Sequence, residues 1–330
     1  MLAEDHPEAA SVTVTAPARL HLGFLDLNGG LGRRFGSIGL AIERPASRLS
    51  ICRSATQEAE GPEAERALRH LAKLTNHLGL RRSYRLKIHE AIPAHAGLGS
   101  GTQLALAVAS ALRRLEGLPL AIPSDAQLLR RGARSGIGLG VFEHGGLVVD
   151  GGRGGQTISP PLIARLEFPA EWRVLVVLDP QSRGVHGAEE QAAFAGLGEF
   201  SAASAAEICR LVLIKALPAL AERDIGSFGD AITRVQEVVG DYFAPAQGGA
   251  PYASAAVAQI VNELRAHGAH GTGQSSWGPT GFAFAASPAE ARRVAGLARD
   301  NAASLGLGVL ICKGVNRGAL IESGALAGIR

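Results

Sequence analysis

The sequence has few cysteines, few lysines and few aromatic residues. Its 330 residues include 3 Cys, 2 Trp and 3 Tyr, and lysine provides only four of the 33 basic side chains. The cysteines are far apart, at Cys52, Cys209 and Cys312, which argues against a disulfide framework or a zinc site and favours a reducing compartment. Although codon preference alone explains an arginine-rich chain, the consequence is that anions would meet planar guanidinium groups that suit phosphate and carboxylate.

The sequence also lacks the features of nucleic-acid and membrane proteins. The net charge is only +3, and aromatic residues make up 5% of the chain, whereas nucleic-acid sites combine a basic stripe with stacking aromatics. Apolar runs such as 174–178 are far too short to cross a bilayer, and the acidic start of the chain does not resemble a signal peptide. We therefore expect a soluble, cytoplasmic protein that binds small molecules, with no nucleic-acid or membrane partner.

Glycine, by contrast, is abundant, at 43 of 330 residues, which is well above the usual ~7%. With 46% hydrophobic residues the chain has enough material for a sizeable core, and its length favours two lobes. Helical and strand patterns are mixed along both halves, which predicts an α+β fold. Glycine and proline concentrate at the start of the window 152–170, so we place domains over residues 1–160 and 161–330.

The clearest local patterns surround one glycine-rich segment. Residues 84–89 alternate between apolar and polar side chains as a strand does, and apolar residues recur at helical spacing over 104–115. Elsewhere, the first strand is predicted to stop at Pro17, and a helix over 125–134 is predicted to begin with Ser124 as its N-cap.

The glycine-rich segment itself is a candidate phosphate site. Closely spaced glycines let successive backbone N–H groups turn inward, and the start of a helix adds its positive end. The segment lacks the lysine of a Walker loop and the spacing of a Rossmann loop, and a turn without any ligand is the alternative. The candidate phosphate-binding residues are Gly97, Leu98, Gly99, Ser100, Gly101, Thr102 and Gln103.

Three segments together resemble the GHMP kinase superfamily. Residues 16–23 (APARLHLG) resemble its first motif, residues 93–100 (PAHAGLGS) its phosphate loop, and residues 273–283 (GQSSWGPTGFA) its third motif. The resemblance implies a GHMP-kinase-like two-lobed fold, with a ribosomal-protein-like N-terminal lobe, a ferredoxin-like C-terminal lobe and the site between them. It also suggests a homodimer.

The resemblance does not extend to the chemistry of the kinases. Many of them have Ser-Gly-Ile-Asp, and that Asp accepts the proton of the substrate hydroxyl; here Ser135-Gly-Ile is followed by Gly138. A glutamate that binds Mg²⁺ in some members corresponds to Gln127. Phosphoryl transfer relies on such groups, so their loss argues against a kinase.

A narrower resemblance is to the branch of β-ribofuranosylaminobenzene 5′-phosphate synthases, which are not kinases. It implies a decarboxylating phosphoribosyltransferase that joins phosphoribosyl pyrophosphate (PRPP) to 4-aminobenzoate, or to 4-hydroxybenzoate, in tetrahydromethanopterin biosynthesis. Carbon dioxide and pyrophosphate are the other products, and Mg²⁺ is the expected cofactor. The segments that carry this resemblance are 19–29, 36–41, 97–103, 135–152, 183–190, 240–252 and 274–279.

The site residues follow from these segments and from what the reaction needs. The catalytic candidates are Arg19, His21, Asp26 and Glu190, and Arg183 is a further candidate for phosphate. The arene-binding candidates are Gln274, Ser275, Ser276 and Trp277, the last of which is hard to explain as a core residue. The metal candidates are Ser100 and Glu143. Each of these residues also has a plain structural explanation, as a surface, capping or packing group.

Two other functions are compatible with the sequence. One is an ATP-dependent small-molecule kinase of the same superfamily, which would need a replacement for the missing Asp. The other is a ligand sensor without turnover, which the missing Asp also fits. Release of carbon dioxide from an arene acid in the presence of PRPP and without ATP distinguishes the synthase from both.

Overall fold

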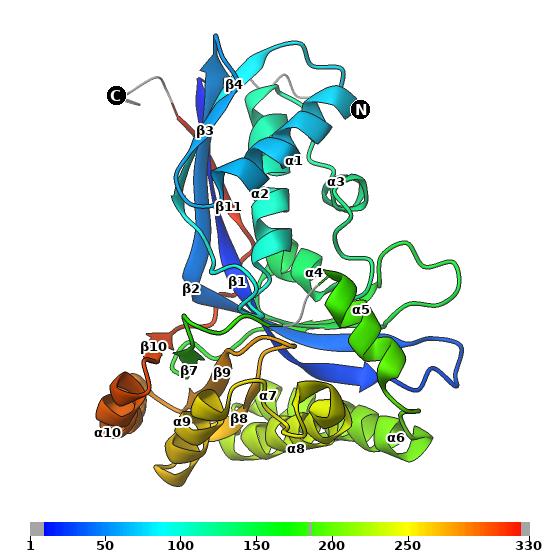
Figure 1. Ribbon diagram of the computed structural model, residues 1–330, viewed down its shortest axis with the longest axis vertical. Helices are drawn as coiled ribbons and strands as arrows, with labels where there is room; N and C mark the ends of the chain where they lie inside the picture. The colour runs from blue at the N-terminus through cyan, green and yellow to red at the C-terminus, as the bar shows by residue number, and fades with distance from the viewer. Residues whose placement is uncertain (1–9, 185–186, 325–330) are drawn as a thin grey trace.

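The protein folds around two β-sheets with helices packed on them. The computed structural model describes residues 10–184 and 187–324, and the side chains of 187–191 are not described. In Figure 1 the larger sheet stands upright with helices on one face, and the smaller sheet and its helices lie below it. None of the helices among the described residues is both long and apolar enough to cross a membrane.

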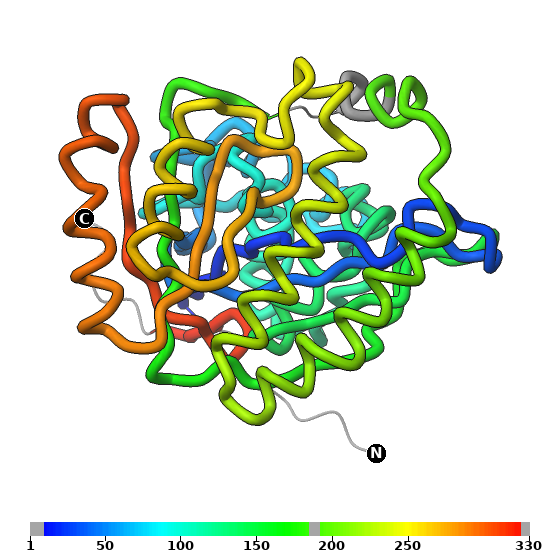
Figure 2. Tube along the Cα trace, turned by 90° about the horizontal axis from the view of Figure 1, so that it is seen from below, coloured from blue at the N-terminus to red at the C-terminus, as the bar shows by residue number. Residues whose placement is uncertain are grey.

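The larger sheet has seven strands in the order β11-β1-β2-β4-β3, with β5 attached to β2 and β6 attached to β5. Its strands are β1 (Ser11–Asp26), β2 (Phe35–Ser54), β3 (Glu58–Glu60), β4 (Ser83–Glu90), β5 (Leu147–Asp150), β6 (Leu162–Leu166) and β11 (Leu320–Gly324). The long β1–β2 hairpin spans the larger sheet, and its turn extends past the other strands, above the helices of the lower layer (Figures 1 and 2).

The expectation that the first strand stops at Pro17 is wrong, because β1 continues for nine residues beyond it. Its pairing with β2 shifts register between Pro17 and Ala18, and again between His21 and Gly23. Proline is tolerated in a strand at such bulges, where no ladder hydrogen bond from its nitrogen is needed. The second shift lies next to His21, whose backbone N–H contacts Ser275 of the other lobe.

Four helices cover one face of the larger sheet. They are α1 (Ala64–His77), α2 (Ser100–Leu115), α3 (Ile122–Leu128) and α4 (Ile137–His144). Almost all of α2 is buried, because α1, α3, α4 and the sheet surround it. The prediction that Ser124 caps a helix is wrong: α3 begins at Ile122 with Pro123 in its first turn, a position where the missing N–H of proline costs nothing.

The smaller sheet has four strands in the order β10-β7-β9-β8. Helix α8 packs on one face of it and α9 and α10 on the other. Its strands are β7 (Arg173–Leu178), β8 (His270–Gln274), β9 (Gly281–Ala285) and β10 (Gly308–Cys312). The helices of this half are α5 (Gly187–Gly196), α6 (Ala202–Leu211), η1 (Val212–Ala216), α7 (Leu217–Glu222), α8 (Ile225–Phe243), η2 (Ala244–Gln247), α9 (Ala255–Ala266) and α10 (Pro288–Ser304).

The chain passes from the larger to the smaller sheet between β6 and β7. It returns at β11, which pairs with β1, so both β6 and β11 lie in the N-terminal lobe. One hydrophobic core joins the lobes, because side chains of β1 and β2 such as Leu20 and Ile38 share a buried cluster with Phe228 of α8. Cys52, Cys209 and Cys312 are all free thiols.

Candidate active site

The glycine-rich loop connects β4 to α2 and has its backbone in unusual conformations. Gly97 (φ 79°) and Gly99 (φ 78°) are in the left-handed region that favours glycine. The N–H groups of Gly99, Ser100 and Gly101 donate no hydrogen bond within the part of the chain that the structure describes. Three free amides at the start of a 16-residue helix have the backbone geometry of an anion-binding nest, and phosphate binding by this nest stays a prediction.

One hydroxyl group ties the three GHMP-like segments together. Ser275 is fully buried, and its Oγ donates to the carbonyl oxygen of Gly97 (2.8 Å) and accepts from the N–H of His21 (3.0 Å). The backbones also meet directly, because a Cβ added at Gly97 would lie 2.1 Å from the carbonyl oxygen of Ser275. The third segment therefore fixes the position of the glycine loop on β1.

Replacing Ser275 with Ala tests this connection. The N–H of His21 would lose its partner in a buried position, and we expect the free energy of unfolding to fall by about 2 kcal/mol. Ser276→Ala is the matched control, because no described residue hydrogen-bonds to that hydroxyl. Urea denaturation of both variants measures the difference, and equal stability of the two would contradict the proposed link.

Arg19 flanks the glycine loop on the side of β1. Its Nη1 donates to the carbonyl of Gly97 (3.1 Å), and its backbone N–H donates to the carbonyl of Leu98 (3.0 Å). The side chain also contacts Gly99, where an added Cβ would lie 3.4 Å from that of Arg19. A guanidinium group thus lies along one edge of the nest.

His21 is two residues further along β1 and is only 3% exposed. Burial lowers the pKa of its imidazole well below the usual range, and the nearby charge of Arg19 lowers this pKa further. Its Nδ1 accepts a hydrogen bond from the N–H of Gly23 (3.3 Å), so the neutral ring carries its proton on Nε2. The structure therefore brings Arg19 and His21 together as a guanidinium and a neutral imidazole.

Gly138 lies in the first turn of α4 and faces the glycine loop. A Cβ at this position would be 3.1 Å from Cγ2 of Thr102. Gln103 is fully buried and its amide donates to the carbonyl of Gly138 (2.9 Å), so Gln103 connects the start of α2 to α4. Gly138, which corresponds to the proton-accepting Asp of many GHMP kinases, is thus close to the nest but carries no side chain.

Seven aromatic side chains gather where β1, α5, α8 and the third segment meet. Ring centroids of neighbours lie 4.3–6.4 Å apart in this aromatic cluster. The expectation that Trp277 is not a core residue is wrong: it is 2% exposed and packs on Phe243 (4.3 Å) and Phe194 (5.2 Å). The members of the cluster are Phe24, Phe35, Phe194, Phe200, Tyr242, Phe243 and Trp277.

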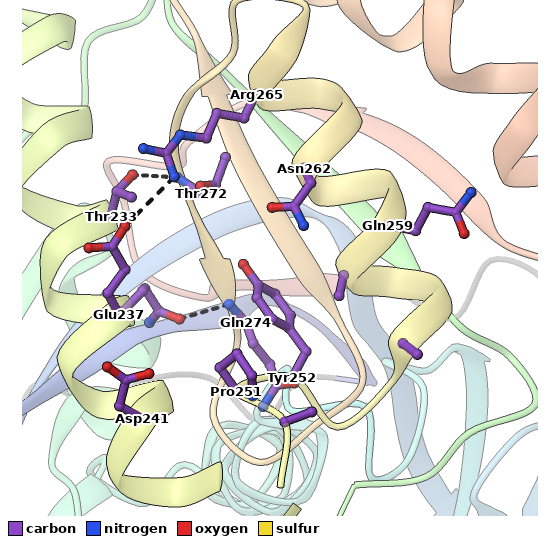
Figure 3. A pocket seen from close by; sticks show the side chains of 14 residues that line it. Thr233, Glu237, Asp241, Pro251, Tyr252, Gln259, Asn262, Arg265, Thr272 and Gln274 are labelled. Carbon is purple, nitrogen blue, oxygen red and sulfur yellow. Dashed lines mark hydrogen bonds and ion pairs between the residues drawn. The ribbon is translucent and has the colours of Figure 1, made fainter.

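Two cavities share Gln274 in their walls. Figure 3 shows the larger one. The larger has a volume of about 540 Å³ and lies between α8, α9 and β8, with Tyr252 and Arg265 in its wall. The smaller, of about 20 Å³, lies beside His21 and Phe24. The amide of Gln274 is used within the protein, since it accepts from the N–H of Ala253 (2.6 Å) and donates to Gln247 (2.9 Å). Gln274 is therefore held in the wall that the two cavities share.

Two predicted carboxylates lie away from the nest. Asp26 ends β1, where it accepts from the N–H groups of Asn28 (2.7 Å) and Gly29 (2.9 Å) and caps the hairpin turn. It lies five positions beyond His21 on β1, a distance of about 16 Å along the strand. Glu143 is exposed near the C-terminal end of α4. Although the residue as a whole is exposed, partial desolvation raises the pKa of its carboxyl. The structure does not bring Glu143 to Ser100, which starts α2.

Three predicted site residues remain, namely Arg183, Glu190 and Ser276. Arg183 is exposed, and its neighbour Gly184 donates to the carbonyl of His95 (2.9 Å). Glu190 belongs to α5, and its side chain lies outside the described residues. Ser276 is half-buried in the wall of the smaller cavity. No described residues form a group of three or more His, Cys, Asp or Glu able to hold a metal ion.

A group of basic residues that was not predicted from the sequence lies on the other flank of the nest. The guanidinium of Arg131, which follows α3, would lie 3.1 Å from a Cβ at Gly101. Next to it on α1 are Arg66 and His70, four residues apart and so on one face of the helix. The four-residue spacing of Arg66 and His70 is the one sequence pattern that could have indicated this group.

The comparisons with known proteins agree with this geometry. Residues 64–148 match the N-terminal domain model of GHMP kinases, and residues 216–300 match the C-terminal one. Among solved structures, homoserine kinase from Cytophaga hutchinsonii is similar with a TM-score of 0.66 at 15% identity, over 96% of this chain and 99% of that one. Mevalonate diphosphate decarboxylase from Staphylococcus aureus gives 0.63 at 14% identity, over 95% and 98%. These two likenesses concern the fold alone.

The two-lobed architecture with a glycine loop on α2 is that of the GHMP kinase superfamily. Two curated relatives are named β-ribofuranosylphenol 5′-phosphate synthase. The one from Archaeoglobus fulgidus is 38% identical over 67% of this chain and 74% of its own length. The one from Methanothermobacter thermautotrophicus is 30% identical over 93% and 98%. Within the superfamily, the chain belongs to this family of synthases and is an enzyme.

Proposed function

We propose that the protein joins PRPP to 4-hydroxybenzoate and releases pyrophosphate and carbon dioxide. The observation that carries this proposal is the 30% identity that extends over 98% of a relative named as the synthase of β-ribofuranosylphenol 5′-phosphate. Because that name describes a phenol, 4-hydroxybenzoate is the first arene acid to test, and 4-aminobenzoate is the second. A kinase is less well supported, since Gly138 offers no base beside the nest.

The proposed reaction exchanges three bonds and needs no net proton transfer. The bond between C1 of the ribose and the pyrophosphate oxygen breaks, and the electron pair leaves with pyrophosphate. The ring carbon that bears the carboxylate then attacks C1, which forms a carbon–carbon bond. The bond to the carboxylate breaks last, and its electron pair restores the aromatic ring. The protein must therefore bind anions, tolerate a transient cation and align the ring with C1.

The residues around the nest match these needs. The free amides of Gly99, Ser100 and Gly101 and the guanidinium of Arg19 suit the pyrophosphate group. A neutral His21 adds no positive charge where the ribose cation develops. The aromatic cluster on the same side provides ring faces for the arene.

A protein-built magnesium site is not part of this proposal. The described residues offer no cluster of ligands, and Ser100 and Glu143 are at unrelated helix ends. This arrangement fits a metal ion only if it arrives bound to pyrophosphate, as Mg²⁺ commonly does.

The test is an incubation of the purified protein with PRPP, Mg²⁺ and carboxyl-labelled 4-hydroxybenzoate, without ATP. We expect labelled carbon dioxide and pyrophosphate in equal amounts. The same incubation with 4-aminobenzoate compares the two arene acids. The proposal is wrong if neither acid gives a product, and ATP-dependent phosphorylation of an alcohol would instead establish a kinase. Binding of PRPP without any product over hours would indicate a sensor.

A further inference from the structure

The basic residues beside Gly101 form a second polar site on the flank of the nest opposite Arg19. We call Arg131, His70 and Arg66 the cationic cluster. Arg66 has a carboxylate partner, Glu63 (3.2 Å). Arg131 has no ion pair among the described residues, and its buried Nε has no hydrogen-bond partner. A partly buried guanidinium without a counter-ion is unfavourable unless a ligand supplies the negative charge.

His70 gives independent support. Its side chain is 6% exposed, and its Nε2 is buried without a hydrogen-bond partner. Burial lowers the pKa of His70 to about 4, and Arg131 and Arg66 are the leading charged contributors. Buried polar atoms in folded proteins are nearly always paired, so an unpaired Nε2 next to an unpaired Nε indicates a missing partner.

The position of the cluster indicates which group that partner carries. In the proposed function, the arene and C1 of the ribose meet near His21 and the aromatic cluster, on the side of the loop where Arg19 lies. The cationic cluster lies on the other side of the first turn of α2, against Gly101. In PRPP the 5′-phosphate is attached at the opposite end of the sugar from the pyrophosphate.

We propose that Arg131, with His70 and Arg66 behind it, binds the 5′-phosphate of the phosphoribosyl substrate, while the nest holds the pyrophosphate. This inference rests on the proposed function, because it assigns the two ends of PRPP to two flanks of one loop. A guanidinium suits a phosphomonoester, to which it donates two parallel hydrogen bonds. The cluster thereby selects substrates that carry a phosphate at both ends.

Two simple ligands separate the two subsites. Ribose 5-phosphate carries only the monoester, and magnesium pyrophosphate carries only the leaving group. In calorimetric titrations, Arg131→Met is expected to weaken ribose 5-phosphate binding by about tenfold or more. Pyrophosphate binding should stay within about twofold. Arg69→Met is the matched control, because Arg69 lies on α1 between Arg66 and His70, is exposed, and has Glu65 as its one ion-pair partner among the described residues.

A second measurement covers the case in which Arg131→Met folds poorly. In the unmodified protein, nitrogen NMR of the His70 ring should respond to ribose 5-phosphate and not to magnesium pyrophosphate. Equal responses to both ligands, or unchanged ribose 5-phosphate binding in a folded Arg131→Met, would overturn the assignment. These binding results are independent of turnover. If Arg131→Met loses ribose 5-phosphate binding but the unmodified protein forms no synthase product, the phosphate site stands and the proposed function is wrong. If the unmodified protein forms the product and Arg131→Met leaves the KM for PRPP unchanged, the proposed function stands and the phosphate site is wrong.

Discussion

Ser100→Tyr is expected to lower kcat/KM for PRPP by at least about 1,000-fold, which corresponds to about 4 kcal/mol. Ser100 is the first residue of α2, and its N–H is one of the three free amides of the nest. A phenol ring at this position occupies the space into which those amides point. Each charge-assisted hydrogen bond that is lost contributes about 1.5–3 kcal/mol, so the loss of two accounts for the expected effect.

The control for this prediction is Ser100→Ala, which keeps the amides accessible and removes only the hydroxyl. We expect it to reduce kcat/KM by no more than about tenfold. Both variants should unfold at nearly the temperature of the unmodified protein, because Ser100 is only partly buried. Full activity of a folded Ser100→Tyr would show that the nest does not bind substrate.

Gly97→Ala is expected to destabilise the protein by about 4 kcal/mol and to abolish turnover. The added Cβ would lie 2.1 Å from the carbonyl oxygen of Ser275 and 3.0 Å from Cα of Gly278, so two backbone segments must separate. The left-handed conformation of Gly97 adds strain for any residue with a side chain. Urea denaturation and a steady-state assay measure the two effects.

Gly99→Ala is the matched comparison, because it has the same left-handed backbone without the collision. Its nearest neighbour would be Cβ of Arg19, at 3.4 Å. We expect a loss of about 1 kcal/mol, which is the backbone strain alone. If the two variants were equally stable, contact between the glycine loop and the 275–278 segment would not be what positions the nest.

Much of the local structure could be predicted from the sequence. The strand at 83–90, the long helix that follows it and the nest between them depend on alternation, helical spacing and close glycines, which act over a few residues. Pro17 and Ser124 misled the prediction for one reason: each is a local signal that tertiary context overrides, in one case by a bulge and in the other by Pro123.

The site was predictable only in part, because it joins segments far apart in the chain. Ser275 carries no signal in the sequence that it would hydrogen-bond to both Gly97 and the N–H of His21. The surroundings of Trp277 in the sequence did not reveal that its ring packs on Phe243, and its arene role stays a prediction. Arg131 was missed because its importance comes from Gly101, thirty residues earlier.

The sequence by itself determined the superfamily, the glycine-rich loop at the start of a helix and the loss of the kinase base at Gly138, since these are properties of short contiguous motifs. Only the tertiary structure decided which charged side chains reach that loop. Arg19 reaches it from β1 and Arg131 from the segment after α3, whereas Asp26 is held in the hairpin turn and Glu143 is at the far end of α4. The physical reason is that packing of the helices on the sheet, and not chain order, sets the distance between charges.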